Sequence, residues 1–292
     1  MVSQGDLFLG VDGGGTGCRA RLVDAAGNRL GEGKGGPANI RLSLEVSWGQ
    51  ILAAMDQALG RAGLDRDALP RIHAGLGLAG ITGPADSARV ASAAPPFASI
   101  AAETDSHTAC LGAFGGQDGA ILIIGTGSAG YAFVGGQSHQ VGGWGFEVSD
   151  DGSGAQIGRE AVRAALCAHD GLGPASGLTG AVMTRLGGHP AEIVAWVNGA
   201  RPADYGSLAP LAFEWAATGD AVAIGLIRQA ADHVDHFARR LTRLGAARIA
   251  LMGGLAPALG GWLSPWLRSL LAEPEGDAMD GAVLLARRTA GR

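Results

Sequence analysis

The sequence of 292 residues is poor in charged and aromatic residues, and these shortages exclude several classes of protein. Charged residues make up 17% of the chain and aromatic residues 5%, whereas 47% are hydrophobic. A disordered chain has high charge and collagen has a strict three-residue glycine period, so the 51 glycines here belong to a folded globular protein. The net charge of −5, without a basic cluster, argues against nucleic acid as a partner.

Cysteines, long apolar runs and targeting signals are also scarce. The cysteines Cys18, Cys110 and Cys167 lie far apart without a CxxC pair, which argues against a disulfide scaffold and a zinc ribbon. The longest aliphatic run, residues 120–124, is too short to span a membrane. The N-terminus has no basic segment followed by a long apolar run, so we expect no signal peptide, no membrane partner and a cytoplasmic protein.

Several common catalytic motifs are missing or weak. The chain has no GxxxxGK[ST] phosphate loop and no serine in a GxSxG elbow. GxGxxG occurs at residues 75–80 and 125–130, but neither match leads cleanly into a helix, which disfavours a dinucleotide site. His233 and His236 have no neighbouring third ligand, so a solvated helix face is a better interpretation than a zinc site.

The hydrophobic pattern repeats within the chain. Residues 7–11 form a short apolar run that predicts a buried strand, followed by a glycine-rich turn and an alternating segment at residues 19–23. Residues 120–124 begin the same series, with a glycine-rich turn and a second alternating segment at residues 131–134. Both halves therefore predict strand, hairpin turn, strand, turn, strand, although unrelated hairpins that happen to carry glycine are an alternative.

Helical patterns alternate with further strands. We predict helices at about residues 46–62, 153–168, 220–244 and 280–288, with Asp220 as an N-cap and Gly245 as a C-terminal glycine. Additional strands are expected at residues 72–78, 99–103 and 248–252. This alternation predicts an α/β fold, and the repetition suggests two similar domains that face a cleft.

Three glycine-rich turns follow predicted buried strands, at residues 13–16, 125–128 and 253–254. Glycine lets backbone N–H groups approach phosphate oxygens, so these turns suit a nucleotide held between two hairpins. Asp12, at the tip of the first strand, could hold Mg²⁺ through water, with simple Asp-Gly turn chemistry as its alternative role. The hydroxyls of Thr16, Thr126 and Ser128 could add phosphate contacts.

These segments resemble a known superfamily. Residues 9–16, 75–80, 124–128 and 251–254 look like the phosphate 1, connect, phosphate 2 and adenosine motifs of the actin-like superfamily of sugar kinases, Hsp70 and actin. Within it, the chain resembles the BadF/BadG/BcrA/BcrD-type ATPase family, which contains N-acetylglucosamine kinases and bacterial glucosamine kinases. Residues 193–196, 204–206 and 262–265 look closest to the bacterial glucosamine kinases. The cysteines show no match to the iron–sulfur site of the family's radical-activating ATPases.

The resemblance implies a fold and domain boundaries. It predicts two actin-like ATPase (ribonuclease H-like) α/β domains around a central cleft. The expected N-terminal domain spans residues 1–112 and is completed by a C-terminal helix at 280–292, while residues 113–279 form the second domain. The family also suggests a homodimer.

The resemblance also assigns roles to individual residues. It makes Asp105 the catalytic base and Asp12 the residue toward Mg²⁺. It assigns ATP contacts to Gly13, Gly14, Gly15, Thr16, Gly125, Thr126, Gly127, Ser128, Gly253, Gly254 and Asp280. It assigns contacts with an amino sugar to Asn39, Gly80, Asp105, Gly143, Trp144 and Asp150. Alternative structural roles remain open at this point: a helix N-cap for Asp105 or Asp280, a turn residue for Asn39, and a core aromatic for Trp144.

The predicted activity is phosphorylation of the 6-hydroxyl of D-glucosamine by ATP. N-acetylglucosamine is the alternative substrate, because the choice depends on the depth of the pocket around carbon 2. A non-catalytic ATP-dependent sugar sensor is a second class of function, and a dehydrogenase is a third.

Overall fold

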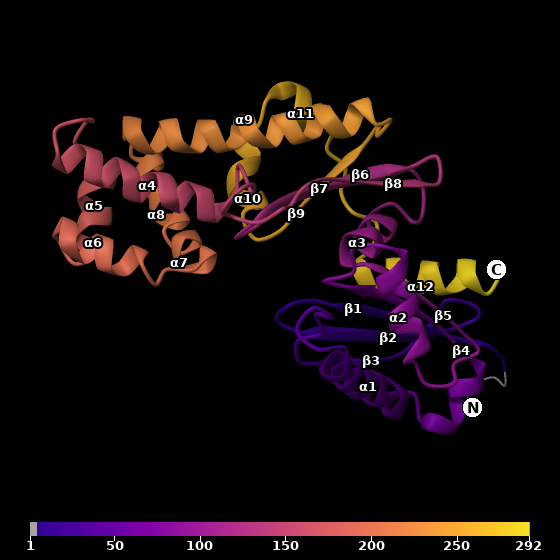
Figure 1. Ribbon diagram of the computed structural model, residues 1–292. Helices are drawn as coiled ribbons and strands as arrows, with labels where there is room; N and C mark the ends of the chain where they lie inside the picture. Colours follow the sequence, from indigo (N-terminus) through magenta and orange to yellow (C-terminus); the bar gives the residue numbers. More distant parts are fainter. Residues whose placement is uncertain (1–4, 292) are drawn as a thin grey trace. The chain divides into compact units, whose positions relative to one another are not determined.

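The computed structural model describes residues 5–291, which form two compact units (Figure 1). Unit 1 contains the chain up to Gly119, the segment Phe133–Ser138 and the residues from Glu273 onward. Unit 2 contains Ala120–Ala132 and His139–Ala272. Residues 1–4 lie outside the described range. They belong to the N-terminal segment in which we expect no signal peptide.

Unit 1 is built on a five-stranded sheet in the order β3-β2-β1-β4-β5. The strands are β1 (Leu7–Gly13), β2 (Cys18–Asp24), β3 (Arg29–Gly35), β4 (Ile72–Leu78) and β5 (Ser99–Thr104). β1 pairs antiparallel with β2 and parallel with β4, and β5 continues the parallel part. The predicted first hairpin and its third strand are confirmed.

Helices cover both faces of this sheet. α1 (Leu44–Arg61) packs against β3 and β2, whereas α12 (Ala278–Thr289) and α3 (Asp105–Ala113) pack together, with α12 on β1 and β4 (Figure 1). The shorter elements are η1 (Arg66–Arg71) and α2 (Pro84–Ser92). The sheet is therefore buried on both sides, as the nearly continuous apolar run of β1 requires.

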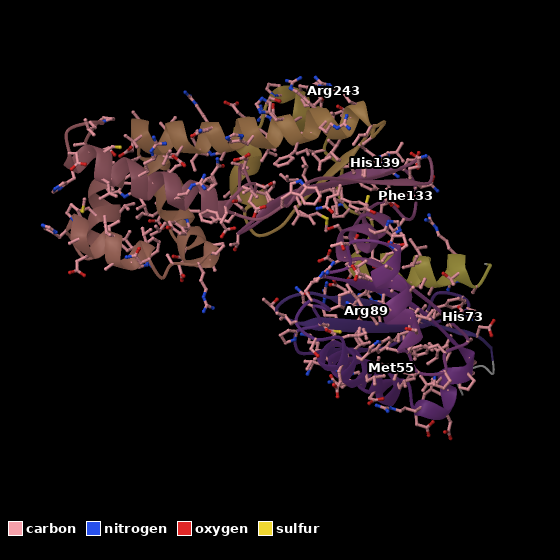
Figure 2. The ribbon with its side chains drawn as sticks, in the orientation of Figure 1. Met55, His73, Arg89, Phe133, His139 and Arg243 are labelled. Carbon is pink, nitrogen blue, oxygen red and sulfur yellow. The ribbon has the colours of Figure 1, made fainter. Side chains whose placement is uncertain are left out.

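Alternate residues of β1 reach the two different cores. Leu9 and Val11 belong to the core that includes Met55 of α1, which is fully buried (Figure 2). Phe8 belongs to a smaller core with Val283 of α12. Successive side chains of a strand point to opposite faces, so one seven-residue strand serves both layers.

Glycines let the helices lie unusually close to the sheet. Gly10 and Gly75 are register partners on β1 and β4. A Cβ atom added to Gly10 would lie 2.3 Å from the carbonyl oxygen of Met279, and one added to Gly75 would lie 2.0 Å from that of Ala282. Both carbonyls belong to α12, so side chains at these two positions would push this helix off the sheet.

The same device operates at the edge strand β3. Added Cβ atoms on its alternating glycines would lie 1.9–2.3 Å from carbonyl oxygens spaced four residues apart along α1. The pairs are Gly31 with Ala58, Gly33 with Ala54 and Gly35 with Gln50. The two-residue period of the strand thus matches one face of the helix.

Unit 2 combines a four-stranded sheet with a helical region. The sheet order is β8-β7-β6-β9, and its strands are β6 (Gly119–Ile124), β7 (Ser128–Val134), β8 (Gln137–Gly142) and β9 (Ile249–Met252). The first residue of β6 and the end of the β7–β8 hairpin, Phe133–Ser138, group with unit 1. β9 runs parallel to β6. The connections between β6, β7 and β8 are too short for parallel crossovers, so these strands form the second predicted hairpin series.

Helices account for most of the remaining chain of unit 2. α4 packs on α5, α7, α8 and α9, and α9 also packs on α8. The helices are α4 (Gly154–His169), α5 (Gly177–Arg185), α6 (Pro190–Val197), α7 (Pro202–Gly206), α8 (Ala209–Ala217), α9 (Ala221–Arg243), α10 (Ala256–Leu259), η2 (Gly260–Trp262) and α11 (Pro265–Leu270). In residues 5–291 no single helix is long and apolar enough to cross a membrane, although α7–α8 and α9 pass that test as a bent pair.

Helix ends agree with the predictions in part. Asp220 caps α9 through the amide of Ala223, and Gly245 follows that helix with a φ of 103°. The predicted start of the last helix at Asp280 is wrong, because Asp277 is the N-cap and Asp280 is the third helical residue. The side chains of these two aspartates each accept a hydrogen bond from the other's backbone amide, forming a capping box.

Candidate functional site

The candidate catalytic residues of unit 1 lie at the carboxyl end of its parallel strands. Gly13 of β1 is the register partner of Leu78 of β4, which pairs in turn with Thr104 of β5. This register brings Asp12 and Asp105 to the same edge of the sheet. Ligands of open α/β sheets bind at this edge, because the loops after neighbouring strands converge there.

The first glycine turn is closed by its own backbone. The amide of Gly14 donates to the carbonyl of Gly17 at 2.8 Å, and the carbonyl of Gly14 accepts from Ala38. Gly15 and Thr16 are exposed, and their amides donate no hydrogen bond to another described residue. Two unused donors in a glycine turn suit an anionic ligand.

Asn39 and Gly80 are adjacent in unit 1. An added Cβ on Gly80, where φ is 90°, would lie 2.5 Å from Oδ1 of Asn39. That oxygen already accepts a hydrogen bond from the amide of Arg41 at 2.9 Å, so Asn39 also shapes its own turn. The structure thus brings these two predicted sugar contacts together and gives Asn39 the turn role that the sequence left open.

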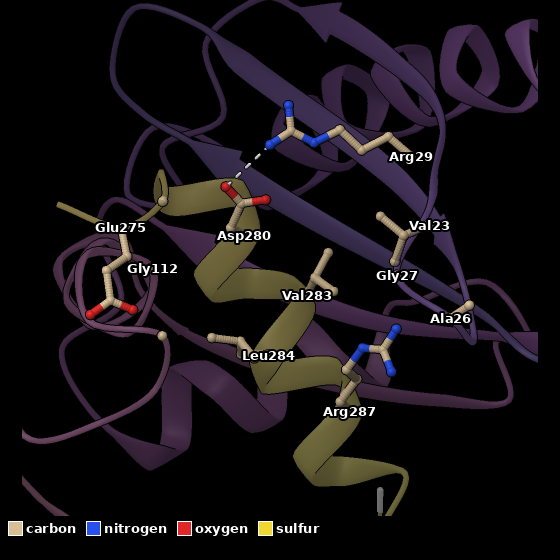
Figure 3. Close-up of a pocket in the computed structure, with 12 residues that line it drawn as sticks. Val23, Ala26, Gly27, Arg29, Gly112, Glu275, Asp280, Val283, Leu284 and Arg287 are labelled. Carbon is tan, nitrogen blue, oxygen red and sulfur yellow. Dashed lines mark ion pairs between the residues drawn. The ribbon is translucent and has the colours of Figure 1, made fainter.

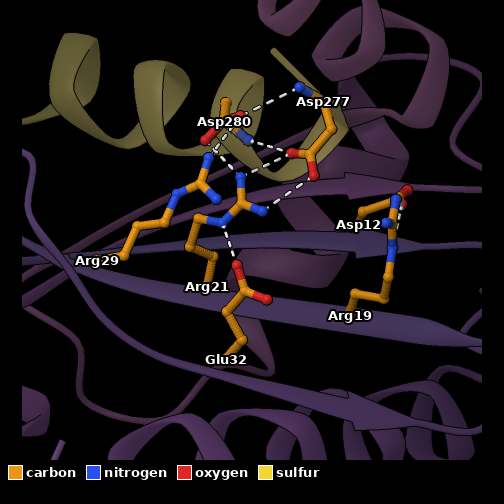
Figure 4. A network of polar contacts seen from close by, with 7 residues as sticks. All are labelled: Asp12, Arg19, Arg21, Arg29, Glu32, Asp277 and Asp280. Carbon is orange, nitrogen blue, oxygen red and sulfur yellow. Dashed lines mark hydrogen bonds and ion pairs between the residues drawn. The ribbon is translucent and has the colours of Figure 1, made fainter.

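Asp12 is paired with a residue that sequence analysis did not select. Arg19 of β2 is its cross-strand register partner and donates to Oδ2 from Nη2 at 2.6 Å and from Nε at 3.2 Å (Figure 4). The hydrogen bond from Arg19 to this carboxylate raises the pKa of the guanidinium further. The predicted hairpin contained the signal, since its turn places position 19 opposite position 12.

Asp105 is the first residue of α3 and is not its N-cap. Thr104 has that role, because its hydroxyl accepts from the amide of His107 at 3.0 Å. Asp105 is partly buried and accepts from the amide and hydroxyl of Ser106, both at Oδ1. Burial raises the pKa of Asp105 despite these hydrogen bonds, and the negative charge of Asp12 adds to the increase.

Asp280 belongs to an ion network that joins α12 to the sheet. The buried Arg21 contacts Asp280 and donates to Asp277 at 2.9 Å and Glu32 at 2.7 Å (Figure 4). Burial lowers the pKa of Arg21, but the hydrogen bonds to the three carboxylates outweigh it and the net pKa is raised. Each carboxylate therefore stabilises a charge that would otherwise be buried alone.

The same aspartate lines a pocket of about 380 Å³ within unit 1. Figure 3 shows Arg29 extending toward Asp280, while Leu284 and Val283 of α12 line the pocket with apolar side chains. Nη2 of Arg29 lies 3.7 Å from Oδ2 of Asp280. The first observed role of Asp280 is thus to anchor α12.

A pocket of about 370 Å³ in unit 2 is lined by six of the nine ligand residues predicted in that unit. Its lining includes the second glycine turn together with the loop after β8, and comprises Ile123, Gly125, Thr126, Gly127, Ser128, Ala129, Gly143, Gly145 and Asp150. The turn is joined to the start of α4, where the amide of Gly154 donates to the carbonyl of Gly125 at 2.8 Å.

Asp150 occupies a conformation that few side chains adopt. Its φ is 63°, the only positive value for a non-glycine residue in the described chain. An added Cβ on Gly127 would lie 2.6 Å from Oδ2 of Asp150, so the carboxylate rests directly on the glycine turn. Burial raises the pKa of Asp150, and the nearby charges of Asp151 and Glu147 contribute to the increase.

The remaining predicted residues of unit 2 are Trp144, Gly253 and Gly254. Trp144 is 68% exposed, which excludes the core role left open from the sequence. Gly253 follows β9 with a φ of 97°, and an added Cβ would lie 2.3 Å from the carbonyl oxygen of Ile124. Because β6 and β9 are parallel neighbours, the turns at Gly125 and Gly253 lie at the same sheet edge. Gly254 comes next, and an added Cβ on it would meet no other atom within 4 Å.

Residues 193–196 and 204–206 were selected from the sequence only for their family resemblance, and their support of the second turn was not predicted. An added Cβ on Gly206 of α7 would lie 3.6 Å from Cγ2 of Thr126. The neighbouring Tyr205 packs against Phe146 with ring centroids 5.1 Å apart, and against Trp196 at 4.9 Å. A short helix thus backs both the turn and the loop that carries Asp150.

Comparisons with known proteins identify the family of the chain. Residues 9–286 match the BadF/BadG/BcrA/BcrD ATPase family. The chain belongs to this family. It is similar to the glucosamine kinase GspK of Vibrio cholerae, with 42% identity over 281 residues and 96% of both chains covered.

Solved structures show the same fold. A candidate N-acetylglucosamine kinase from Chromobacterium violaceum has a TM-score of 0.85 and 38% identity, covering 97% of this chain and all of that one. A ROK family glucokinase from Streptomyces griseus, solved with glucose and AMPPNP, has a TM-score of 0.53 at 19% identity, covering 97% of this chain and 99% of that one. The predicted α/β actin-like ATPase fold is confirmed.

Proposed function

We propose that the protein is a glucosamine kinase, which transfers the γ-phosphoryl group of ATP to the 6-hydroxyl of D-glucosamine. Similarity to a glucosamine kinase over nearly the whole length supports this assignment. The structural observation that carries it is Asp105, a partly buried carboxylate with no capping duty, at the same sheet edge as Asp12 and the first glycine turn.

Asp105 suits the role of a general base. Both hydrogen bonds from Ser106 reach Oδ1, so Oδ2 is left to accept a proton from a sugar hydroxyl. In the proposed reaction the 6-oxygen forms a bond to the γ-phosphorus while the bond from that phosphorus to the β–γ bridging oxygen breaks. The hydroxyl proton passes to Asp105, and ADP leaves. Such transfers depend mainly on positioning and electrostatics, with the base orienting the nucleophile.

The backbone turns suit the nucleotide. In unit 1, the amides of Gly15 and Thr16 donate to no other described residue and are available to phosphate oxygens. In unit 2, the turn 125–128 lines its pocket, and we assign Gly253, Gly254 and the turn to the same nucleotide.

Asp12 fits a magnesium ion that enters with the nucleotide. Its Oδ1 has no partner among the described residues, and residues 5–291 contain no group of three or more His, Cys, Asp or Glu side chains that could hold a metal on their own. Mg²⁺ is commonly held by one or two carboxylates plus substrate phosphates, with waters retained. When bound, the ion would neutralise charge on the phosphates.

Asp150 supports the choice of free amino sugar. A carboxylate in the unit 2 pocket can pair with a 2-ammonium group, which N-acetylation would remove. We also assign sugar contacts to Gly143 and Trp144 of that unit, and to Asn39 and Gly80 of unit 1.

The test is ADP formation with ATP, Mg²⁺ and each of glucosamine, N-acetylglucosamine and glucose, followed by identification of the phosphosugar by ³¹P NMR. We expect glucosamine to give the highest kcat/KM and a 6-phosphate product. No sugar-dependent ADP above the ATP-only rate refutes the kinase assignment, and a preference for N-acetylglucosamine reverses the substrate choice. Asp150→Asn should reduce kcat/KM more for glucosamine than for N-acetylglucosamine.

The protein is also proposed to act in the cytoplasm as a homodimer. Light scattering after size-exclusion chromatography measures the oligomeric state, and cell fractionation measures the location.

A further inference from the structure

The ion pair between Arg19 and Asp12 differs from the other arginine contacts of the unit 1 sheet. Arg21 is 4% exposed in its side chain and is held by three carboxylates. The side chain of Arg19 is 46% exposed, and within residues 5–291 its ion-pair partner is Asp12. Figure 4 shows the two arrangements, with Arg19 and Asp12 apart from the network around Arg21. Arg19 is therefore the less constrained of the two.

The geometry of the pair leaves half of the carboxylate open. Nε and Nη2 of Arg19 both donate to Oδ2 of Asp12, at 3.2 and 2.6 Å. An arginine that binds a carboxylate bidentately normally uses both of its oxygens. Here Oδ1 accepts from no described residue, so Arg19 fixes the rotamer of Asp12 without covering the second oxygen.

We propose that Arg19 is a positioning residue that serves as the counter-ion of Asp12 in the nucleotide-free protein and weakens the capture of free divalent cations by this carboxylate. The inference rests on the proposed function, because it takes Asp12 as the residue toward Mg²⁺. A guanidinium repels a divalent cation at the same carboxylate, so metal brought by a triphosphate would be favoured over metal from solution. Exposure of the pair also permits Arg19 to move aside.

The test uses electron paramagnetic resonance to measure the affinity of the protein for Mn²⁺ in the absence of nucleotide and sugar. Mn²⁺ prefers oxygen ligands as Mg²⁺ does. Arg19→Met should bind Mn²⁺ about tenfold more tightly than the wild type, because the repulsion of a divalent ion by a charge a few ångströms away in a largely aqueous setting is of that order. Arg19→Lys keeps the charge and should stay near the wild type.

Two further variants show where the ion binds. Arg29→Met is the matched control. Arg29 is an exposed cation of the same sheet, but it pairs with Asp280 instead of Asp12. This control variant should leave Mn²⁺ affinity unchanged. The double variant Asp12→Asn/Arg19→Met should lose the gain in affinity.

Absence of a gain in folded Arg19→Met overturns the inference, as does an equal gain in Arg29→Met or a gain that survives Asp12→Asn. Thermal unfolding verifies folding, and a purely structural pair would lower the melting temperature without tightening Mn²⁺ binding. The proposed function fails separately, through absence of sugar-dependent ADP formation by the wild type. A kinase without the Mn²⁺ effect refutes only the role of Arg19.

Discussion

Replacement of Asp105 by asparagine should separate catalysis from folding, because its neighbour caps the helix. Thr104 accepts from the amide of His107, whereas the Asp105 side chain accepts from the amide of the adjacent Ser106 at 2.7 Å and from its hydroxyl at 3.3 Å. Asparagine has nearly the same shape and can still accept at Oδ1. Asp105→Asn should therefore retain the helix and remove the base.

The expected loss of kcat/KM is about 10²–10⁴-fold, the usual contribution of a general base, which corresponds to roughly 3–5 kcal/mol. The free energy of unfolding, in contrast, should not decrease in this variant at pH 7. Burial raises the pKa of Asp105, so the ionised carboxylate destabilises the fold at pH values above that raised pKa. Asp105→Asn should be at least as stable as the wild type at pH 7. This advantage should disappear as the pH falls through the raised pKa towards the ordinary value for aspartate.

Thr104→Ala is the matched control. Loss of an N-cap typically lowers the free energy of unfolding by about 1 kcal/mol. That loss corresponds to a decrease of roughly 2–4 °C in melting temperature for a protein of this size class. The rate of phosphoryl transfer by Thr104→Ala should be proportional to the fraction of this variant that is folded.

Coupled ADP release with glucosamine measures transfer, and thermal unfolding with and without ATP measures folding and nucleotide binding. The wild-type rate should also rise with pH through the raised pKa of Asp105, whereas the residual rate of Asp105→Asn should lack that dependence. The reasoning is refuted if Asp105→Asn keeps more than about a tenth of wild-type kcat/KM. It is also refuted if this variant loses as much stability as Thr104→Ala.

Three further predictions concern glycine packing, the nucleotide turn and a buried histidine. Gly112→Ala should destabilise unit 1 by about 3 kcal/mol in thermal unfolding, because its Cβ would lie 1.9 Å from a carbonyl oxygen at the start of α12. Gly49→Ala on α1 is the control, since its Cβ would meet no other atom within 4 Å, and it should stabilise the protein by about 1 kcal/mol. Gly253→Ala should raise the KM for ATP by about tenfold to a hundredfold by displacing the turn, while Gly261→Ala, with open space around it, should leave it unchanged. Burial lowers the pKa of His107 to about 4, with a smaller effect of a nearby guanidinium. The free energy of unfolding should therefore fall by up to about 3 kcal/mol as the pH decreases from about 6.5 to 4. His107→Asn should remove that part of the pH dependence. Equal stability of the two helix glycine variants, equal KM values of the two turn variants, or an unchanged pH dependence in His107→Asn would contradict the respective argument.

Local patterns predicted much of the fold. The apolar runs at residues 7–11 and 120–124 become β1 and β6, and each begins a series of three strands. Helix boundaries were less accurate, since α1 covers Leu44–Arg61 instead of 46–62. The reason is that the periodic pattern of apolar residues shows which helix face is buried but does not fix where the helix ends. A boundary depends on an individual capping bond, such as that between the Ser43 hydroxyl and the amide of Val46.

The candidate site was predictable where it depends on strand ends. Asp12 lies one residue before the end of β1 and Asp105 directly follows β5, and parallel pairing places both at one edge of the sheet. Their partners were not predictable from composition. Arg19 reaches Asp12 only through the register of the hairpin, and Thr104 takes the cap that sequence analysis allowed for Asp105.

The sequence by itself determined where the glycine turns fall, because a turn after a buried strand is a local property of the chain. Only the tertiary structure decided what many of the other glycines do. Gly112 and Gly281 lie far apart in sequence, yet added Cβ atoms on them would lie 1.9 Å and 1.8 Å from carbonyl oxygens of the opposite helix in the α3–α12 pair. Likewise Arg21 finds Asp277 across 256 positions. Hydrophobic periodicity shows which face of an element is buried, but it does not specify which other element covers that face.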